Sequence, residues 1–339
     1  MSPRAFGWWS ALSLCAACGP RDVRNDAAID PPYALVLPAG APSVPVPKGS
    51  PLTEASVALG KALFFEERLS QGRGLSCASC HRPDHAFSDT VATSLDAHGR
   101  SGARNAPTLM NVAYVPLLMW DGGVPSLEQQ VLVPLGPEGE MSMDIGRAAA
   151  ALKDEEPYRS LCRKAYGREL DLFAVTHALA SYERTLISGT SRSDRFQYGG
   201  DSAALTASEQ RGRALFNAPR LGCAVCHSGH DLSDHGFHNI GLALDHTGDP
   251  GRERITLAPA DRGAFKTPTL RNIARTAPYM HDGSMATLEE VIDHFASGGV
   301  ADPNKSPLMR GFQLTAKERQ DLLAFLRSLT DERNLDQVR

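Results

Sequence analysis

The sequence predicts a mainly α-helical protein made of two tandem domains of similar design. Residues 60–64 (GKALF) are matched at residues 212–216 (GRALF), which indicates an internal repeat. Helical apolar patterns follow Thr206 and Thr315, and each threonine precedes a Glu by three residues, as in a capping box. Gly and Pro divide the remaining sequence into long loops, and no alternation of apolar and polar residues predicts a strand convincingly.

The repeat extends well beyond these helices. Residues 106–113 (APTLMNVA) correspond to residues 267–274 (TPTLRNIA). Two pairs of triplets follow at equal spacing: WDG at 120–122 with HDG at 281–283, and SLE at 126–128 with TLE at 287–289. Because a length of 339 residues suits about two domains, two copies of one domain explain the pattern.

Each copy of the repeat contains a C-x-x-C-H motif. The residues are Cys77, Cys80 and His81 in the first copy, and Cys223, Cys226 and His227 in the second. This is the attachment signature of haem c, in which both thiols bond to the haem vinyl groups and the His binds the iron. A zinc site or a redox dithiol also uses C-x-x-C, but neither explains a His after the second cysteine in both copies. We therefore expect two tandem cytochrome c-like domains, each with one covalently bound haem c.

The N-terminus has the pattern of an export signal. Arg4 precedes a short, mostly apolar stretch at residues 5–17, which is too short to span a bilayer comfortably. Cys18 follows two alanines, as at a bacterial lipoprotein cleavage site, where the cysteine would carry the lipid that anchors the protein. A buried N-terminal helix is the alternative. We expect a signal at residues 1–18 and a periplasmic protein, with Cys18 as the candidate lipid anchor.

The remaining chain divides into three parts. Residues 19–50 are rich in Pro, Ala and Asp and predict an extended tether, although a strap lying on the body fits nearly as well. An N-terminal haem domain is expected at residues 51–200 and a C-terminal one at residues 201–339. Cys162 stands outside the haem motifs and is expected to be a small buried apolar residue. A net charge of −4 without any basic stripe argues against nucleic acid as a partner.

Taken together, these motifs resemble the bacterial di-haem cytochrome c peroxidase family. One branch of that family matures the tryptophan tryptophylquinone of methylamine dehydrogenase. The resemblance covers about residues 52–330 and includes the spacing of several motifs as well as both haem sites. It implies that the N-terminal haem reacts with hydrogen peroxide and that the C-terminal haem delivers electrons. The implied electron donor is a small cytochrome c or a cupredoxin, and the chain could form a homodimer.

The resemblance assigns three catalytic residues. Trp120 would lie between the haems and carry electrons, and Gln130 would orient peroxide. Glu140 would act as general acid and base, taking a proton from one peroxide oxygen and returning it to the other. Taken singly, Trp120 is most simply a core aromatic residue and Glu140 a solvated surface carboxylate. Their joint spacing with Gln130 favours the catalytic interpretation.

The resemblance also assigns the remaining iron ligands. Met285 would bind the iron of the second haem, where a thioether raises the reduction potential. The maturase branch has Tyr at this position, so Met285 favours peroxidase, although a plain core Met is the alternative. His98 is the best candidate for a distal ligand of the first haem, His85 is the other, and a solvated loop is the ordinary place for either.

A calcium ion between the domains is usual in this family. The side chain of Asn105 and the backbone carbonyls of Lys266 and Pro268 match its protein ligands. Few protein oxygens together with waters suit a hard, hydrated cation. Alternatively, Asn105 simply caps a turn.

Two other functions remain compatible with the sequence. A di-haem maturase or oxidase would act on a protein substrate, and Met285 argues against its best-known form. A di-haem electron carrier would lack a substrate pocket, and the Gln130 and Glu140 pair argues against that, because a carrier has no need of a proton-handling carboxylate.

Overall fold

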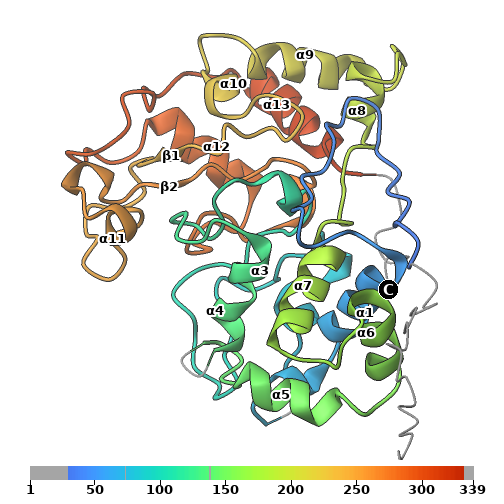
Figure 1. Ribbon diagram of the computed structural model, residues 1–339. Helices are drawn as coiled ribbons and strands as arrows, with labels where there is room; N and C mark the ends of the chain where they lie inside the picture. The colour runs from blue at the N-terminus through green and yellow to red at the C-terminus, as the bar shows by residue number, and fades with distance from the viewer. Residues whose placement is uncertain (1–29, 73, 137–138, 332–339) are drawn as a thin grey trace, which may run out of the picture.

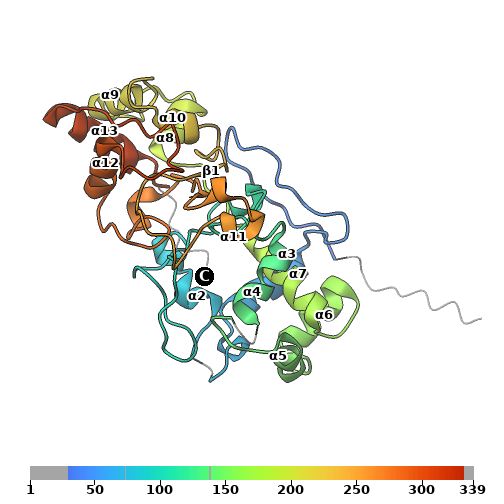
Figure 2. The ribbon, with the colours of Figure 1, turned by 90° about the vertical axis from the view of Figure 1, so that its left-hand side faces the viewer.

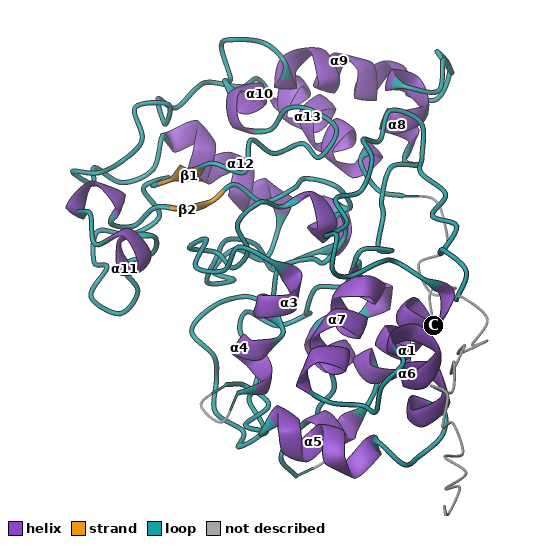
Figure 3. Ribbon diagram, viewed as in Figure 1, coloured by secondary structure: helices purple, strands orange, loops and turns teal. Residues whose placement is uncertain are grey.

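The computed structural model describes residues 30–72, 74–136 and 139–331, and it consists of two helical lobes (Figure 1). The expected signal at residues 1–18 and Cys18 lie outside the described residues. Long loops connect short helices in both lobes (Figure 3). Within the described residues the one sheet is an antiparallel pair, β1 (Phe237–His238) and β2 (Phe265–Lys266). The expectation of a mainly α-helical fold is therefore confirmed.

The N-terminal lobe is built around a crossing of its first and last long helices. Its α-helices are α1 (Glu54–Phe64), α2 (Cys77–Cys80), α3 (Leu127–Gln130), α4 (Leu132–Leu135), α5 (Ile145–Leu152), α6 (Tyr158–Tyr166) and α7 (Leu172–Glu183), with 3-10 turns η1 (Glu67–Leu69), η2 (Pro83–His85) and η3 (Val112–Tyr114). At the crossing of α1 and α7, a Cβ on Gly60 would lie 1.8 Å from the carbonyl oxygen of Ala178. The two helices therefore approach this closely only because residue 60 has no side chain.

The C-terminal lobe repeats this crossing. Its elements are α9 (Ala207–Phe216), α10 (Cys223–Cys226), α11 (Glu253–Thr256), α12 (Leu288–Ser297) and α13 (Ala316–Ser328), with η4 (Pro259–Asp261) and η5 (Ile273–Arg275), and α8 (Arg192–Gln197) joins the lobes. Here α9 crosses α13, and a Cβ on Gly212 would lie 1.9 Å from the carbonyl oxygen of Asp321. The repeated GKALF and GRALF segments thus mark the same helix contact in both lobes.

The sequence signals for helix starts are confirmed. Thr206 and Thr315 form the expected capping boxes at the starts of α9 and α13. The repeated SLE and TLE triplets are also helix starts, because Ser126 caps α3 and Thr287 caps α12. Each cap satisfies a backbone N–H that has no partner within the helix.

Residues 30–50 lie against the body as a strap, so the tether expected from residue 19 does not describe this part of the segment (Figure 2). At its start, the N–H of Tyr33 donates to the carbonyl of Leu52 at 3.0 Å. Near its middle, the hydroxyl of Tyr114 donates to the carbonyl of Pro42 at 2.9 Å. Gly40 has a φ of +80°, and a Cβ there would lie 2.4 Å from the ring of Tyr198, next to α8. The alternative of a strap on the body therefore fits these residues.

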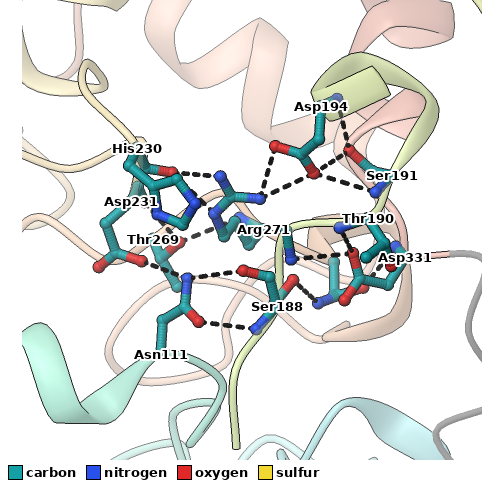
Figure 4. A network of polar contacts seen from close by, with 12 residues as sticks. Asn111, Ser188, Thr190, Ser191, Asp194, His230, Asp231, Thr269, Arg271 and Asp331 are labelled. Atoms are coloured by element: carbon teal, nitrogen blue, oxygen red, sulfur yellow. Dashed lines mark hydrogen bonds and ion pairs between the residues drawn. The ribbon is translucent and has the colours of Figure 1, made fainter. Parts of the chain in front are cut away.

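One asparagine in each lobe, at equivalent positions, joins the lobe to the segment that follows its last long helix, and Figure 4 shows Asn111 in this contact. Asn111 and Asn272 both adopt left-handed backbone angles and begin the short helices η3 and η5. The carboxamide of Asn111 accepts from the N–H of Ser188 at 2.7 Å, and that of Asn272 accepts from the N–H of Asp331 at 2.8 Å. Asn272 also donates to the Ser188 hydroxyl at 2.9 Å, so Ser188 contacts both asparagines.

Two smaller expectations concern burial and membranes. Cys162 is fully buried in the N-terminal core, as expected for a small apolar residue. Among the helices of the described residues, none has the length and apolar character needed to cross a bilayer.

Candidate functional site

The two C-x-x-C-H motifs form the same local structure. Cys77–Cys80 and Cys223–Cys226 are single-turn helices, α2 and α10. The N–H of the following histidine donates to the carbonyl of the first cysteine at 2.9 Å in both motifs. Both cysteines and the histidine of a motif therefore lie on one compact turn.

The histidines have the tautomer and environment that an iron ligand needs. Nδ1 of His81 lies 3.1 Å from the carbonyl oxygen of Phe87, and Nδ1 of His227 lies 3.0 Å from that of Leu232. A carbonyl only accepts, so Nδ1 carries the proton and Nε2 keeps its lone pair for a metal. Burial lowers the pKa of both imidazoles, which favours the neutral form that binds iron.

The four motif cysteines are free thiols in partly buried positions. Burial is the main reason that the pKa of Cys77 is raised to about 12 and that of Cys223 to about 11, and it also raises the pKa of Cys80. A neutral sulfur is therefore favoured, as in the thioether bonds of haem c. The residues of both motifs fit this cofactor.

Trp120 lies at the contact between the lobes. Its indole N–H donates to the carbonyl of Asn105 at 2.8 Å, and its own carbonyl accepts from the N–H of Lys266 at 2.8 Å. Phe265, the other residue of β2, stacks on His281 with ring centroids 3.5 Å apart. Since His281 is the counterpart of Trp120 in the repeat, the two WDG and HDG turns meet across the lobe contact.

An ion-pair network surrounds this contact. The fully buried carboxylate of Asp121 pairs with Arg104 at 2.7 Å and also with Arg254. Arg104 in turn donates two hydrogen bonds of 2.6 Å to Asp249 of the C-terminal lobe. The guanidinium of Arg104 thus joins carboxylates of both lobes next to Trp120, and no motif in the sequence indicated this pairing.

Glu140 and His98 are brought close through the backbone. The N–H of Ala97 donates to the carbonyl of Glu140 at 2.7 Å, which places the His98 turn beside the catalytic candidate. Asp96 holds that turn, because its carboxylate accepts from the N–H of His98 at 2.9 Å. Glu140 and His98 are both exposed in the protein alone.

The electrostatics place Glu140 near the first haem motif. Its charge acts on Cys77, Cys80 and His81, although burial dominates the pKa of each. Gln130, at the end of α3, is half-buried, and its amide nitrogen lies 4.0 Å from the sulfur of Met119. The alternative ligand His85 has its Nδ1 3.1 Å from a carboxylate oxygen of Asp84. The choice between His98 and His85 stays open.

Met285 lies in the C-terminal lobe beside the second haem motif. Its backbone forms a bridge with Tyr279, and its side chain packs on the same apolar cluster as Cys223. The N-terminal lobe forms the matching bridge between Leu118 and Val124. A sulfur ligand is therefore available at this place of the repeat in the second lobe alone.

The three expected calcium ligands gather around Trp120. Asn105 and Lys266 bond to opposite ends of this residue, and Pro268 follows β2 by two residues. The amide nitrogen of Asn105 donates to the carbonyls of Val91 and Ala92, at 3.2 and 3.1 Å. Calcium at this position stays a prediction.

Sequence reasoning missed two groups of buried polar residues. Asn111 and Asn272 carry the lobe junction, and their signal was present as the shared Asn of the repeated 106–113 and 267–274 segments. Glu183, a buried carboxylate at the end of α7, lies outside the matched motifs and gave no such signal.

Comparisons with known proteins agree with this architecture. Residues 54–203 match the family model of di-haem cytochrome c peroxidase, and residues 209–330 match that of cytochrome c. The chain is 41% identical to methylamine utilization protein MauG of Methylorubrum extorquens over 86% of this chain and 82% of the relative. It is 34% identical to a cytochrome-c peroxidase of Denitromonas iodatirespirans over 94% of this chain and 92% of the relative.

A solved structure has the same fold throughout. A MauG-like protein associated with microbial copper homeostasis superposes with a TM-score of 0.85 at 35% identity, covering 89% of this chain and 97% of that one. Both lobes are therefore cytochrome c-type domains, and their family implies haem c as the cofactor. The paired haem motifs and these matches show that the chain belongs to the di-haem cytochrome c peroxidase family, a family of oxidoreductases related to MauG.

Proposed function

We propose that this protein is a cytochrome c peroxidase that reduces hydrogen peroxide to two waters with two electrons and two protons. The observation that carries the proposal is Met285, whose side chain packs on the same apolar cluster as Cys223. A Met ligand would give the C-terminal haem a high potential, suited to accepting electrons from a donor. The donor would be a small periplasmic cytochrome c or cupredoxin.

The haem held by Cys77, Cys80 and His81 would supply the iron at which peroxide is reduced. Glu140 would accept the proton of one peroxide oxygen and return it to the other, which then leaves as water. Gln130 would hold peroxide or a pocket water by its amide. The hydrogen bond between Ala97 and Glu140 supports this arrangement, because it fixes the Glu140 backbone beside the His98 turn.

Trp120 would be the electron relay between the lobes. Its indole N–H donates to Asn105 and its backbone carbonyl accepts from Lys266, which fixes the residue at the lobe contact. Calcium bound by Asn105 and the carbonyls of Lys266 and Pro268 would hold the same segments. A relay held on both sides keeps its distance to either haem constant.

Oxidation of a protein substrate is the second candidate function. The relatives named MauG share 41% and 40% identity with this chain, against 34% for the peroxidase reported above. The same Glu140 and Gln130 would serve it, because peroxide is the implied oxidant in both cases. The two functions differ in whether the electrons come from a small redox protein or from a protein side chain.

The test is steady-state peroxide reduction by the holoenzyme with a reduced small cytochrome c as donor. We expect turnover, and we expect Glu140→Gln to lower it by about a hundredfold or more while both haems are retained, since general acid–base catalysis contributes about that much. Glu54→Gln, at an exposed position at the start of α1, makes the same chemical change and is the matched control. Wild-type turnover that is negligible with every donor would favour the second candidate, and an unchanged rate in Glu140→Gln would remove Glu140 from the site.

We further propose export to the periplasm, with Cys18 as a lipid anchor. The expected signal at residues 1–18 supports it. Mass spectrometry of the mature protein tests it, because a lipidated N-terminus at residue 18 has a distinct mass. An N-terminus at another residue would contradict the anchor.

A further inference from the structure

Glu183 is a buried carboxylate that the peroxidase mechanism leaves unused. It is the last residue of α7 and is 5% exposed. Within the described residues its Oε2 atom has no hydrogen-bond partner. A buried carboxylate without a full set of partners is costly, so its presence calls for a physical reason.

The repeat shows which residue occupies this position in the C-terminal lobe. A Cβ on Gly60 would contact Tyr182, whereas a Cβ on Gly212 would contact Phe325. These contacts make Tyr182 and Phe325 counterparts, so the next residue, Glu183, corresponds to Leu326. Leu326 is an ordinary core residue, 7% exposed. One lobe therefore has a carboxyl group where the other has a leucine.

The neighbouring ion pair does not account for Glu183. Arg184 pairs with Glu128 of α3 at 2.8 Å. The C-terminal lobe has the equivalent pair between Arg327 and Glu289 at 3.0 Å, without any carboxylate at position 326. Since the pair forms in both lobes, Glu183 is an additional ionisable group specific to the N-terminal lobe.

This additional ionisable group lies close to the first haem motif. Burial is the main reason for the raised pKa of Cys77, and the charge of Glu183 comes next, ahead of those of Cys80 and Glu140. The porphyrin bonded to Cys77 would therefore lie within electrostatic reach of Glu183, in a region of low dielectric.

The groups around Glu183 leave it able to change protonation state. Burial raises its pKa to about 8, with Arg184 opposing and Glu128 adding to that effect. The other ionisable groups within its reach are Cys77 of α2 and Tyr182 of α7, and both have a raised pKa. In the described part of the chain, α1 and α5, which also pack on α7, add no charge that acts on it.

We propose that Glu183 couples proton uptake to reduction of the N-terminal haem. When one electron from the donor reaches that haem, the carboxylate of Glu183 takes one proton from solvent and becomes neutral. When the electron leaves, the proton returns to solvent. The net charge of the buried site is thus constant, which lowers the electrostatic penalty of reduction. Leu326 gives the C-terminal haem no such group.

The proposal depends on haem attachment at Cys77 and does not depend on peroxide as substrate. The test is a spectroelectrochemical titration of the holoprotein, without peroxide, from about pH 5 to about pH 10. We expect the equilibrium constant for reduction of the N-terminal haem to change by up to tenfold per pH unit within this range. For one electron this is a shift of about 59 mV in the midpoint potential. In Glu183→Gln this dependence should be lost, and at high pH the midpoint should lie above that of the wild type.

The same titration contains its control, because the C-terminal haem is measured in the same molecule and should respond equally in both proteins. Glu140→Gln is the comparison for a second nearby carboxylate and should keep the dependence. If Glu183→Gln fails to fold, Glu183→Leu copies the C-terminal lobe and should show the same loss. A wild-type midpoint that is independent of pH, or a dependence that persists without the carboxylate, would overturn the proposal. Loss of the pH dependence in Glu140→Gln but not in Glu183→Gln would also overturn the proposal.

Discussion

The two lobes share their framework and differ at individual buried or half-buried positions. Both have the glycine-mediated helix crossing and the asparagine at the junction. Three of the differences between them are Met110 against Arg271, Val124 against Met285, and Glu183 against Leu326. The shared positions build the common framework, whereas these three differences change the chemistry of single side chains within it. The lobes can therefore be tested against each other within one molecule.

The largest expected effect concerns Met285, which has Val124 as its counterpart. If Met285 binds the second iron, Met285→Leu should abolish the sulfur-to-iron absorption in the near infrared and lower the potential of that haem, because a thioether ligand raises it. Leu keeps the volume of Met, so folding should be preserved. Near-infrared spectroscopy of the oxidised protein measures the effect. Met280→Leu, on the same loop, is the matched control, and loss of the absorption in that variant alone would reassign the ligand.

The next effect concerns Arg271, which has Met110 as its counterpart. Its guanidinium is 2% exposed, lies 2.9 Å from both carboxylate oxygens of Asp194, and donates to the carbonyl of His230 (Figure 4). Arg271→Met should lower the free energy of unfolding by about 3–5 kcal/mol, because it leaves a buried carboxylate unpaired. Denaturant unfolding measures this. The double variant with Asp194→Asn should recover part of the loss, and no recovery would mean that the pair is not the cause.

A smaller effect is expected at the helix crossings, where the lobes are alike. Gly60→Ala and Gly212→Ala should each cost about 1–3 kcal/mol of stability, because the added methyl group meets a backbone carbonyl. Gly248→Ala is the control, since a Cβ at that position has no neighbour within 4 Å. Similar losses at Gly60 and Gly212 would confirm that the lobes share this contact. A loss in one lobe only would break the equivalence.

The smallest effect on stability is expected only at acid pH and only from the N-terminal lobe. The hydrogen bond from Arg68 holds the pKa of Glu66 near 2, below its usual 4.5, whereas the repeat places Ala218 at the equivalent position. A carboxyl group with a lowered pKa in the folded state stabilises the fold above about pH 4.5 and loses that contribution as the pH falls through about 2. Glu66→Gln should flatten the loss of stability over this range. Unfolding curves at a series of acid pH values measure it, and parallel curves for both proteins would refute the assignment.

The local features of the fold could be predicted from sequence. The haem motifs, the caps at Thr206 and Thr315 and the repeat itself depend on residues close together in the chain, and the structure has each of them. Burial of Cys162 could also be predicted, because an unpaired cysteine outside the motifs is usually a core residue.

Long-range contacts could not be predicted. Arg104 pairs with Asp249 across 145 residues, and nothing in either local sequence indicates the partner. The expected tether does not describe residues 30–50 for a related reason. A proline-rich composition is compatible with any extended path, and contacts with Tyr114 and Tyr198 determine which path these residues follow. The roles of Glu140, Gln130 and His98 depend on a cofactor-filled pocket, so their positions in the protein alone leave those roles as predictions.

The strap has one further consequence, for the segment that connects the two lobes. Residues 30–50 contact Tyr114 of the N-terminal lobe and pass next to Tyr198, which ends α8, the helix that joins the lobes. These contacts reduce the conformational freedom of the connecting segment, because a residue packed against a neighbour has fewer accessible conformations. The strap in this way restrains the connection between the lobes as well as covering the surface.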